Sequence, residues 1–260
     1  MKLRCINIRP SHQSASLSAL LSEHGFDVYE FPTLYLSSTG EDVSPGEGWV
    51  AATSANSFRF LVNPDALNKS KVAVIGGYTG MFAKSLGLDV AFTSEIAEST
   101  AFGNSLGRYL NSIGVNQVSF LLGSNAGQDF QRAIEKYNIL CDTKEIYKVE
   151  KIQKSADELI DFNKFISHEA QYVIFATSSM ALVSFCESLV QISDDLLATA
   201  QNDYKLVVIG PKTAKKAKKL GFKQILLSEE VSVTDMVNTC LLYTSPSPRD
   251  ATLSRMPSSA

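Results

Sequence analysis

Hydroxyl side chains follow several of the expected strands, at positions where helices should begin. Thr53-Ser54 follows a short apolar run in the first half of the chain, and Thr177-Ser178 follows another in the second half. The first N–H groups of a helix have no partner within the helix and carry a partial positive charge. Because a neighbouring hydroxyl adds a donor, such turns suit carboxylates or phosphates. The alternative is that each serine or threonine only caps its own helix.

A second kind of turn also occurs once in each half. Thr79 follows an apolar run that ends at Gly76, and Thr213 follows one that ends at Gly210. Together with the Thr-Ser turns, these motifs form a duplicated strand–turn–helix unit. Such a duplication predicts two similar α/β lobes with a ligand cleft between them. We therefore expect functional residues in loops from both lobes.

Two further turns lie between an expected strand and an expected helix. One begins at Arg9, and the other contains Ser124 and Asn125. Ligands of open parallel sheets bind at the carboxyl ends of the strands, so turns of this kind together favour a polyanionic ligand. The sequence around Gly76 lacks the GxGxxG spacing and no GxxxxGK[ST] motif occurs, which argues against a nucleotide site.

Tyr147 stands at the end of an extended segment, residues 143–149. A tyrosine in such a place is most often a half-buried strand residue. If it faces the cleft, its hydroxyl is a candidate general acid.

Apolar strands alternate with helices up to residue 240, which predicts parallel sheets covered by helices on both faces. The simplest pairing along the chain joins segment 1–36 to 48–112 and segment 116–150 to 171–240. The expected strands or extended segments are 3–8, 26–36, 49–52, 71–75, 88–92, 117–122, 141–152, 171–176, 205–209 and 223–227. The expected helices are 14–24, 55–62, 79–86, 99–111, 128–137, 156–167, 179–190, 213–220 and 233–240.

The composition is that of an ordinary globular protein. The 260 residues are 45% hydrophobic and 20% charged, with a net charge of −3, which argues against nucleic acid as the main partner. No apolar run is long enough to cross a membrane, and the N-terminus shows no signal peptide. The four cysteines lie far apart without a CxxC motif, which predicts buried thiols in the cytoplasm and no metal site.

A lysine-rich stretch follows Gly210 and contains Lys212, Lys215, Lys216, Lys218 and Lys219. Such a run is usually the solvated face of a helix, and the other interpretation is that it attracts an anionic ligand. Residues 241–260 are rich in serine, threonine and proline, and the apolar periodicity stops there. We interpret them as a non-native, disordered tail.

Several short motifs lie in a fixed order over about residues 1–240. They are Arg9-Pro10, Thr53-Ser54, Ile75-Gly76 with Thr79, Tyr147, Thr177-Ser178, Ile209-Gly210 with Thr213-Ala214, and Gly221. In type, order and spacing this set resembles the uroporphyrinogen-III synthase family. Two positions depart from the family pattern: Gly80 stands where alanine is usual, and Gly123-Ser124 stands where many members have Arg-Gly.

The resemblance implies a fold of two α/β lobes joined by a two-stranded linker with a mobile hinge. Residues 1–36 and 150–240 would form the first lobe, and residues 37–149 would form the second. The linker strands would be residues 31–36 and 145–150.

The resemblance also implies the reaction. The family cyclises hydroxymethylbilane, a linear tetrapyrrole with eight carboxylates, to uroporphyrinogen III, with loss of water and inversion of the last pyrrole ring. Tyr147 would be the general acid, and the substrate carboxylates would be held by Arg9, Thr53, Ser54, Thr79, Ser124, Asn125, Ser178, Lys212 and Thr213. No metal or organic cofactor would be needed.

The same resemblance gives expectations about partners. We expect a cytoplasmic monomer that contacts hydroxymethylbilane synthase transiently, and neither nucleic acid nor a membrane. Two alternatives remain open: a non-catalytic protein that binds a tetrapyrrole or polycarboxylate on this scaffold, and an enzyme for a phosphorylated sugar or nucleotide.

Overall fold

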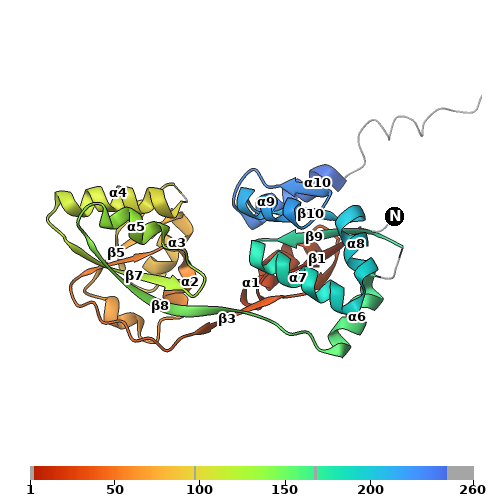
Figure 1. Cartoon of the computed structure of the whole chain (residues 1–260), viewed down its shortest axis with the longest axis horizontal. Coiled ribbons are helices and arrows are strands. Elements are labelled where there is room, and N and C mark those ends of the chain that lie inside the picture. Colours follow the sequence, from red (N-terminus) through yellow and green to blue (C-terminus); the bar gives the residue numbers. More distant parts are fainter. Residues whose placement is uncertain (1–2, 97, 167–168, 245–260) are drawn as a thin grey trace, which may run out of the picture. The chain divides into compact units, whose positions relative to one another are not determined.

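The computed structural model describes residues 3–96, 98–166 and 169–244 (Figure 1). The chain divides into two compact units. Unit 1 comprises Met1–Tyr35 and Lys151–Ala260, and unit 2 comprises Leu36–Glu150. The chain therefore passes from one unit to the other twice.

Unit 1 contains a five-stranded parallel sheet in the order β11-β10-β9-β1-β2. Its strands are β1 (Leu3–Asn7), β2 (Asp27–Glu30), β9 (Gln171–Ala176), β10 (Lys205–Val208) and β11 (Gln224–Leu227). Its helices are α1 (Ser11–Glu23), α6 (Ala156–Ile166), α7 (Ser179–Ile192), α8 (Asp194–Asp203), α9 (Pro211–Lys219) and α10 (Val233–Thr244).

Unit 2 contains a six-stranded sheet in the order β3-β8-β7-β4-β5-β6. Its strands are β3 (Leu34–Ser38), which begins in unit 1, β4 (Trp49–Ala52), β5 (Lys71–Ile75), β6 (Asp89–Ser94), β7 (Gln117–Gly123) and β8 (Leu140–Lys151). Its helices are α2 (Ala55–Arg59), α3 (Gly76–Ser85), α4 (Ser99–Ser112) and α5 (Asp129–Glu135), with a 3₁₀ turn at Pro64–Leu67.

The two sheets share one strand order once β3 is set aside. The order β8-β7-β4-β5-β6 of unit 2 corresponds to β2-β1-β9-β10-β11 of unit 1. In each sheet the order reverses at one point, between β7 and β4 and between β1 and β9, and this switch point is where open α/β sheets bind ligands. The simple pairing of segment 1–36 with 48–112 is therefore wrong: β1 pairs with β2 and β9, and β4 pairs with β5 and β7.

Alternate side chains of each strand enter cores on opposite faces of the sheet. In β4, Val50 and Ala52 pack with Phe58 of α2, whereas Trp49 and Ala51 pack in the cluster with α4 and α5. All four residues of β4 are buried, as expected for a central parallel strand with helices on both faces. In unit 1 the corresponding packing joins β1, β9 and β10 to α1 and α10.

Strand β8 is hydrogen-bonded to the segment that contains β3. The N–H of Ile152 donates to the carbonyl of Thr33 at 2.9 Å, and the N–H of Thr39 donates to the carbonyl of Ile146 at 3.0 Å. Residue numbers rise from Thr33 to Thr39 along one segment while those of the hydrogen-bonded partners fall from Ile152 to Ile146 along the other, so the two strands are antiparallel.

Several elements differ from the expected ones, among them α3, α8 and α10. Helix α3 begins at Gly76, so the residues from Gly76 to Thr79 form its first turn and not a loop before it. Gly76 has a φ of +70°, a backbone conformation that favours glycine. Helix α8 was not expected, because it is short and Ala200 is its only buried residue. Helix α10 continues to Thr244, so the expected tail boundary at 241 is wrong, and residues 245–260 lie outside the described part of the chain.

Candidate functional site

Tyr147 and Ser54 meet at the carboxyl edge of the unit 2 sheet. Strand β4 ends at Ala52 just before Ser54, β7 ends at Gly123, and β8 carries Tyr147. These three strands are neighbours in the sheet and run parallel, so their carboxyl ends lie together at the switch point. We call the cluster of Ser54, Gly123, Ser124 and Tyr147 the Tyr147 site.

A β-bulge aims the Tyr147 side chain. The register between β7 and β8 pairs Leu122 with Glu145 and then Gly123 with Tyr147, which leaves Ile146 as the extra residue. In a regular strand, successive side chains point to opposite faces. Here Ile146 and Tyr147 both pack against the cluster that contains Phe58, because the bulge turns one of them.

Gly123 provides the space that the Tyr147 ring occupies. A Cβ atom at position 123 would lie 2.4 Å from Cζ and 2.9 Å from the hydroxyl oxygen of Tyr147. This is far inside van der Waals contact, so a side chain at 123 and the ring in its present place exclude each other. The glycine that departs from the Arg-Gly pattern is therefore linked to the position of the tyrosine.

Ser54 both caps a helix and contacts the tyrosine. Its backbone is extended (φ −148°, ψ 141°), and its Oγ accepts a hydrogen bond from the N–H of Asn56 at 3.2 Å. The same hydroxyl is hydrogen-bonded to the Tyr147 side chain. The Ser54 hydroxyl therefore joins the first turn of α2 to the phenol.

The turn after β7 is tied to β8 by two hydrogen bonds. The N–H of Ser124 donates to the carbonyl of Tyr147 at 2.9 Å, and Oγ of Ser124 accepts from the N–H of Val149 at 3.2 Å. The residues from Ser124 to Gly127 are exposed. The turn is thus fixed at one side and open to solvent at the other.

The environment of the Tyr147 phenol disfavours its ionisation. Burial raises the pKa of Tyr147 above its ordinary value, and the hydrogen bond with Ser54 lowers it in part. Phe60 stacks on the ring, with centroids 5.9 Å apart and planes inclined by 29°. A half-buried phenol of this kind can donate a hydrogen bond or a proton at neutral pH.

The other residues predicted for unit 2 lie on the same sheet edge but differ in exposure. Thr53 is half-buried beside Ser54, and Asn125 is exposed in the turn after β7. Thr79 is 7% exposed within α3, so little of its side chain reaches solvent.

The predicted residues of unit 1 lie at the matching edge. Ser178 caps α7, with its Oγ accepting from the N–H of Ala181 at 3.0 Å. Thr213 is only 5% exposed, whereas Lys212 is exposed at the start of α9. The guanidinium of Arg9 donates to Ser16 and Gln13 of α1, both at 3.2 Å, so it braces that helix.

Two residues that contact the Tyr147 ring, Phe60 and Gly123, were not predicted as site residues from the sequence. Phe60 follows α2 and shows no spacing that links it to Tyr147. Gly123 was noted only as a departure from the family pattern, although a glycine at the end of a strand is a known signal of close approach by another group.

Comparison with known proteins decides the family. The family model of uroporphyrinogen-III synthase HemD matches residues 15–238. The chain belongs to the uroporphyrinogen-III synthase family. Among curated relatives, a "Putative uroporphyrinogen-III synthase" of Methanocaldococcus jannaschii is 25% identical over 233 residues, which cover 86% of this chain and 92% of the relative. A protein of the same description from Archaeoglobus fulgidus is 26% identical and covers 82% and 87%.

Solved structures of the uroporphyrinogen-III synthase family share the fold. The Helicobacter pylori enzyme superposes with a TM-score of 0.64 at 10% identity, over 94% of this chain and all of that one. A mutant Thermus thermophilus uroporphyrinogen III synthase gives a TM-score of 0.52 at 15% identity, with the same coverage. At such identities the likeness establishes the fold alone.

The described residues also contain cysteines and other side chains that could carry chemistry or bind metal. All four cysteines are buried, as predicted, and none of them forms a disulfide bond within the described residues. No group of three or more His, Cys, Asp or Glu side chains among these residues could hold a metal ion. None of the helices described has the length and apolar character that a membrane span requires.

Proposed function

We propose that the chain is a uroporphyrinogen-III synthase, which cyclises hydroxymethylbilane to uroporphyrinogen III with loss of water and inversion of the last pyrrole ring. The observation that carries the proposal is the placement of the Tyr147 phenol at the switch point of the unit 2 sheet, beside Ser54 and over Gly123. Family membership supplies the substrate class, and the phenol supplies the acid that the reaction needs.

The first step is loss of the terminal hydroxyl of the substrate. Tyr147 gives its proton to that hydroxyl, the carbon–oxygen bond breaks, and water leaves. The lone pair of the adjacent pyrrole nitrogen replaces the lost bond, which gives an azafulvene cation. A positioned general acid accelerates such a step by roughly 10²–10⁴-fold.

The second step is ring closure with inversion. The last pyrrole ring attacks through its already substituted carbon and forms a spiro intermediate, whose rearrangement inverts that ring. The proton released when the ring regains aromaticity restores the protonated phenol. Since hydroxymethylbilane also closes without an enzyme to the non-inverted isomer, the protein must mainly hold the conformer that forms the spiro intermediate.

The carboxylates of the substrate are bound by helix starts and turns in this proposal. In unit 2 the donors are the N–H groups of the exposed turn after Gly123 with Ser124 and Asn125, together with Thr53 and Thr79. In unit 1 they are Ser178, Lys212 and Thr213. Hydroxyl and backbone N–H donors at helix N-termini suit carboxylates without any metal.

The reactivity of the substrate bears on the partners. We propose that the protein works in the cytoplasm as a monomer. Because hydroxymethylbilane closes spontaneously, we also propose that the protein receives it in a transient contact with hydroxymethylbilane synthase.

An isomer assay tests the proposal. The purified protein is incubated with freshly generated hydroxymethylbilane, and the oxidised type I and type III porphyrins are separated by chromatography. We expect type III to predominate. Type I alone, as in the control without enzyme, would refute the proposal and favour a non-catalytic tetrapyrrole-binding protein, an alternative suggested by Gly123-Ser124 in place of Arg-Gly.

A further inference from the structure

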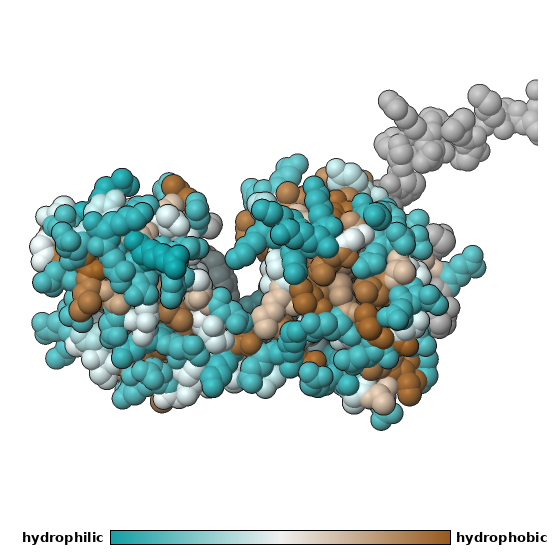
Figure 2. Space-filling model, viewed as in Figure 1, coloured by the Kyte–Doolittle hydropathy of each residue, from teal (hydrophilic) through white to brown (hydrophobic). Residues whose placement is uncertain are grey.

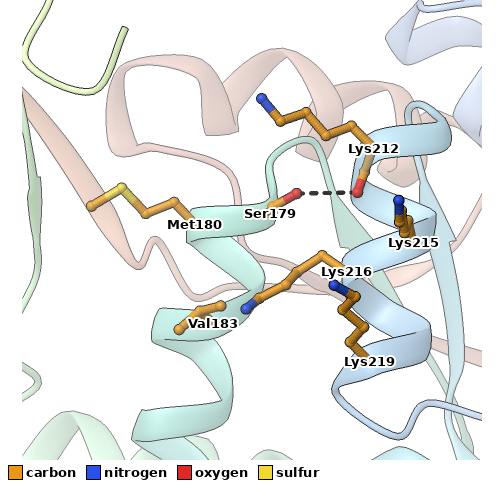
Figure 3. Close-up of a pocket in the computed structure, with 7 residues that line it drawn as sticks. All are labelled: Ser179, Met180, Val183, Lys212, Lys215, Lys216 and Lys219. Atoms are coloured by element: carbon orange, nitrogen blue, oxygen red, sulfur yellow. Dashed lines mark hydrogen bonds between the residues drawn. The ribbon is translucent and has the colours of Figure 1, made fainter. Parts of the chain in front are cut away.

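A cavity of about 420 Å³ lies between α7 and α9 of unit 1. Ser179, Met180 and Val183 of α7 line one side of it, and four lysines of α9 line the other: Lys212, Lys215, Lys216 and Lys219 (Figure 3). We call it the lysine groove. Oγ of Ser179 donates to the carbonyl of Lys212 at 3.4 Å, which holds the upper ends of the two helices together. In the same view, Lys216 extends across the groove toward Val183.

The positive charge of the groove is not neutralised within the protein. Across residues 3–96, 98–166 and 169–244, none of these four ammonium groups forms an ion pair or a hydrogen bond. Helix α9 contains five lysines and no acidic residue, and the surface over it is hydrophilic (Figure 2). Like charges placed this close repel each other, so an anion in the groove would relieve a cost that the free protein carries.

The apolar residues that line the groove indicate which kind of anion it could bind. Met180 and Val183 give it an apolar side, which a small, fully hydrated anion such as phosphate does not use. A ligand that carries carboxylates on an apolar ring system matches both sides. The upper end of the groove lies at the starts of α7 and α9, next to the predicted residues Ser178 and Thr213.

We propose that the lysine groove is a binding site for carboxylate side chains of the tetrapyrrole substrate. This inference rests on the proposed function for the identity of the substrate. Lys215, Lys216 and Lys219 thereby join Lys212 as specificity residues. Their ammonium groups are point charges on flexible side chains, so they can bind carboxylates in several orientations.

Direct binding of an unreactive polycarboxylate tests the groove without any need for turnover. The probe is benzenehexacarboxylate, measured by calorimetry at low salt, with inorganic phosphate in parallel. The groove variant is K215Q/K219Q. The matched control is K218Q/K223Q, which removes the same charge from two exposed lysines of unit 1 that do not line the groove. Glutamine and lysine have similar helix propensities, so α9 should stay folded, and circular dichroism checks this.

We expect the groove variant to raise Kd for benzenehexacarboxylate about tenfold and the control variant less than about twofold, because each lost ion pair at a surface contributes a modest amount. Equal Kd values for the two variants, or tighter binding of phosphate than of the polycarboxylate, would overturn the proposal.

Kinetics with hydroxymethylbilane provide the second readout. The groove variant should raise KM about tenfold, and kcat and the fraction of type III product should be unchanged. A fall in kcat without a change in KM would overturn the assignment of the groove to substrate binding. If the wild type makes only type I product while binding of the polycarboxylate still depends on Lys215 and Lys219, the proposed function fails and the anion site stands.

Discussion

The carboxyl edges of the two sheets have the same strand order but use their polar groups differently. In unit 1, the side chain of Asn7 at the end of β1 is hydrogen-bonded within the fold: it donates to Ser14 and Ser18 and accepts from the N–H of Arg9. In unit 2, the corresponding strand β7 ends in Gly123, whose missing side chain leaves room for Tyr147, and the turn after it is exposed.

The two serine caps show the same contrast. Ser54 and Ser178 have nearly identical backbones, with φ −148° and ψ 141° for the first and φ −146° and ψ 148° for the second. Both cap the helix that follows, but Ser54 is also hydrogen-bonded to a half-buried phenol. A duplicated scaffold thus has its candidate acid on one edge only, while unit 1 contributes the lysine groove.

Filling the space at position 123 should break this contrast most strongly. In Gly123→Ala the new Cβ would meet the Tyr147 ring at 2.4 Å, so the ring must move. A displacement of about 1 Å costs on the order of 100-fold in rate, and we expect that loss in type III formation. Initial rates of the isomer assay measure it.

Gly127→Ala is the matched control in the same turn. Its Cβ would lie 3.6 Å from Asp129, an ordinary contact, so we expect a nearly unchanged rate. A Gly123→Ala protein that is folded by thermal melting and as fast as the wild type would show that the position of the tyrosine does not matter.

Shortening α10 should affect unit 1 and spare unit 2. A chain ending at Thr239 loses Cys240, which is fully buried, and Leu241, which packs on the same core. We expect unfolding to become easier by about 2–4 kcal/mol. A chain ending at Thr244 should melt like the full chain. Equal melting of the two shortened chains would contradict the packing of α10.

Removing the capping hydroxyl of Ser54 or of Ser178 tests the difference between the two units further, with a smaller expected effect on stability. Ser54→Ala and Ser178→Ala each lose one helix cap, which costs about 1 kcal/mol. Only Ser54→Ala also removes the hydrogen bond that lowers the pKa of Tyr147.

The direction of the pH effect follows from the acid role. Tyr147 donates only while protonated, so activity falls as pH rises through its pKa. In Ser54→Ala that pKa rises further, and the alkaline limb of the pH–rate profile should move to higher pH, whereas Ser178→Ala should leave the limb in place. A limb that moves equally in both variants, or to lower pH in Ser54→Ala, would refute the link between Ser54 and the phenol.

Local features of the fold could be predicted from the sequence, and long-range ones could not. The strands 49–52, 71–75 and 171–176 were predicted to the residue, because each is a short apolar run that ends in a turn. The pairing of β1 with β9 joins residues far apart in sequence, and no local pattern reports it.

The candidate site shows the same limit. Ser54 and Tyr147 could be picked out by type and position, but their contact depends on a bulge in β8 and on a missing side chain at 123. Neither is visible until the strands are paired. The roles given to these residues stay predictions.

The rate of type III formation by Tyr147→Phe, relative to wild type, tests the central claim most directly. The variant keeps the ring over Gly123 and its stacking on Phe60 but loses the hydroxyl, and with it the proton and the hydrogen bond with Ser54. We predict a fall of roughly 10²-fold or more with the fold intact. Full turnover and an unchanged isomer ratio would contradict the assignment of Tyr147 as the acid.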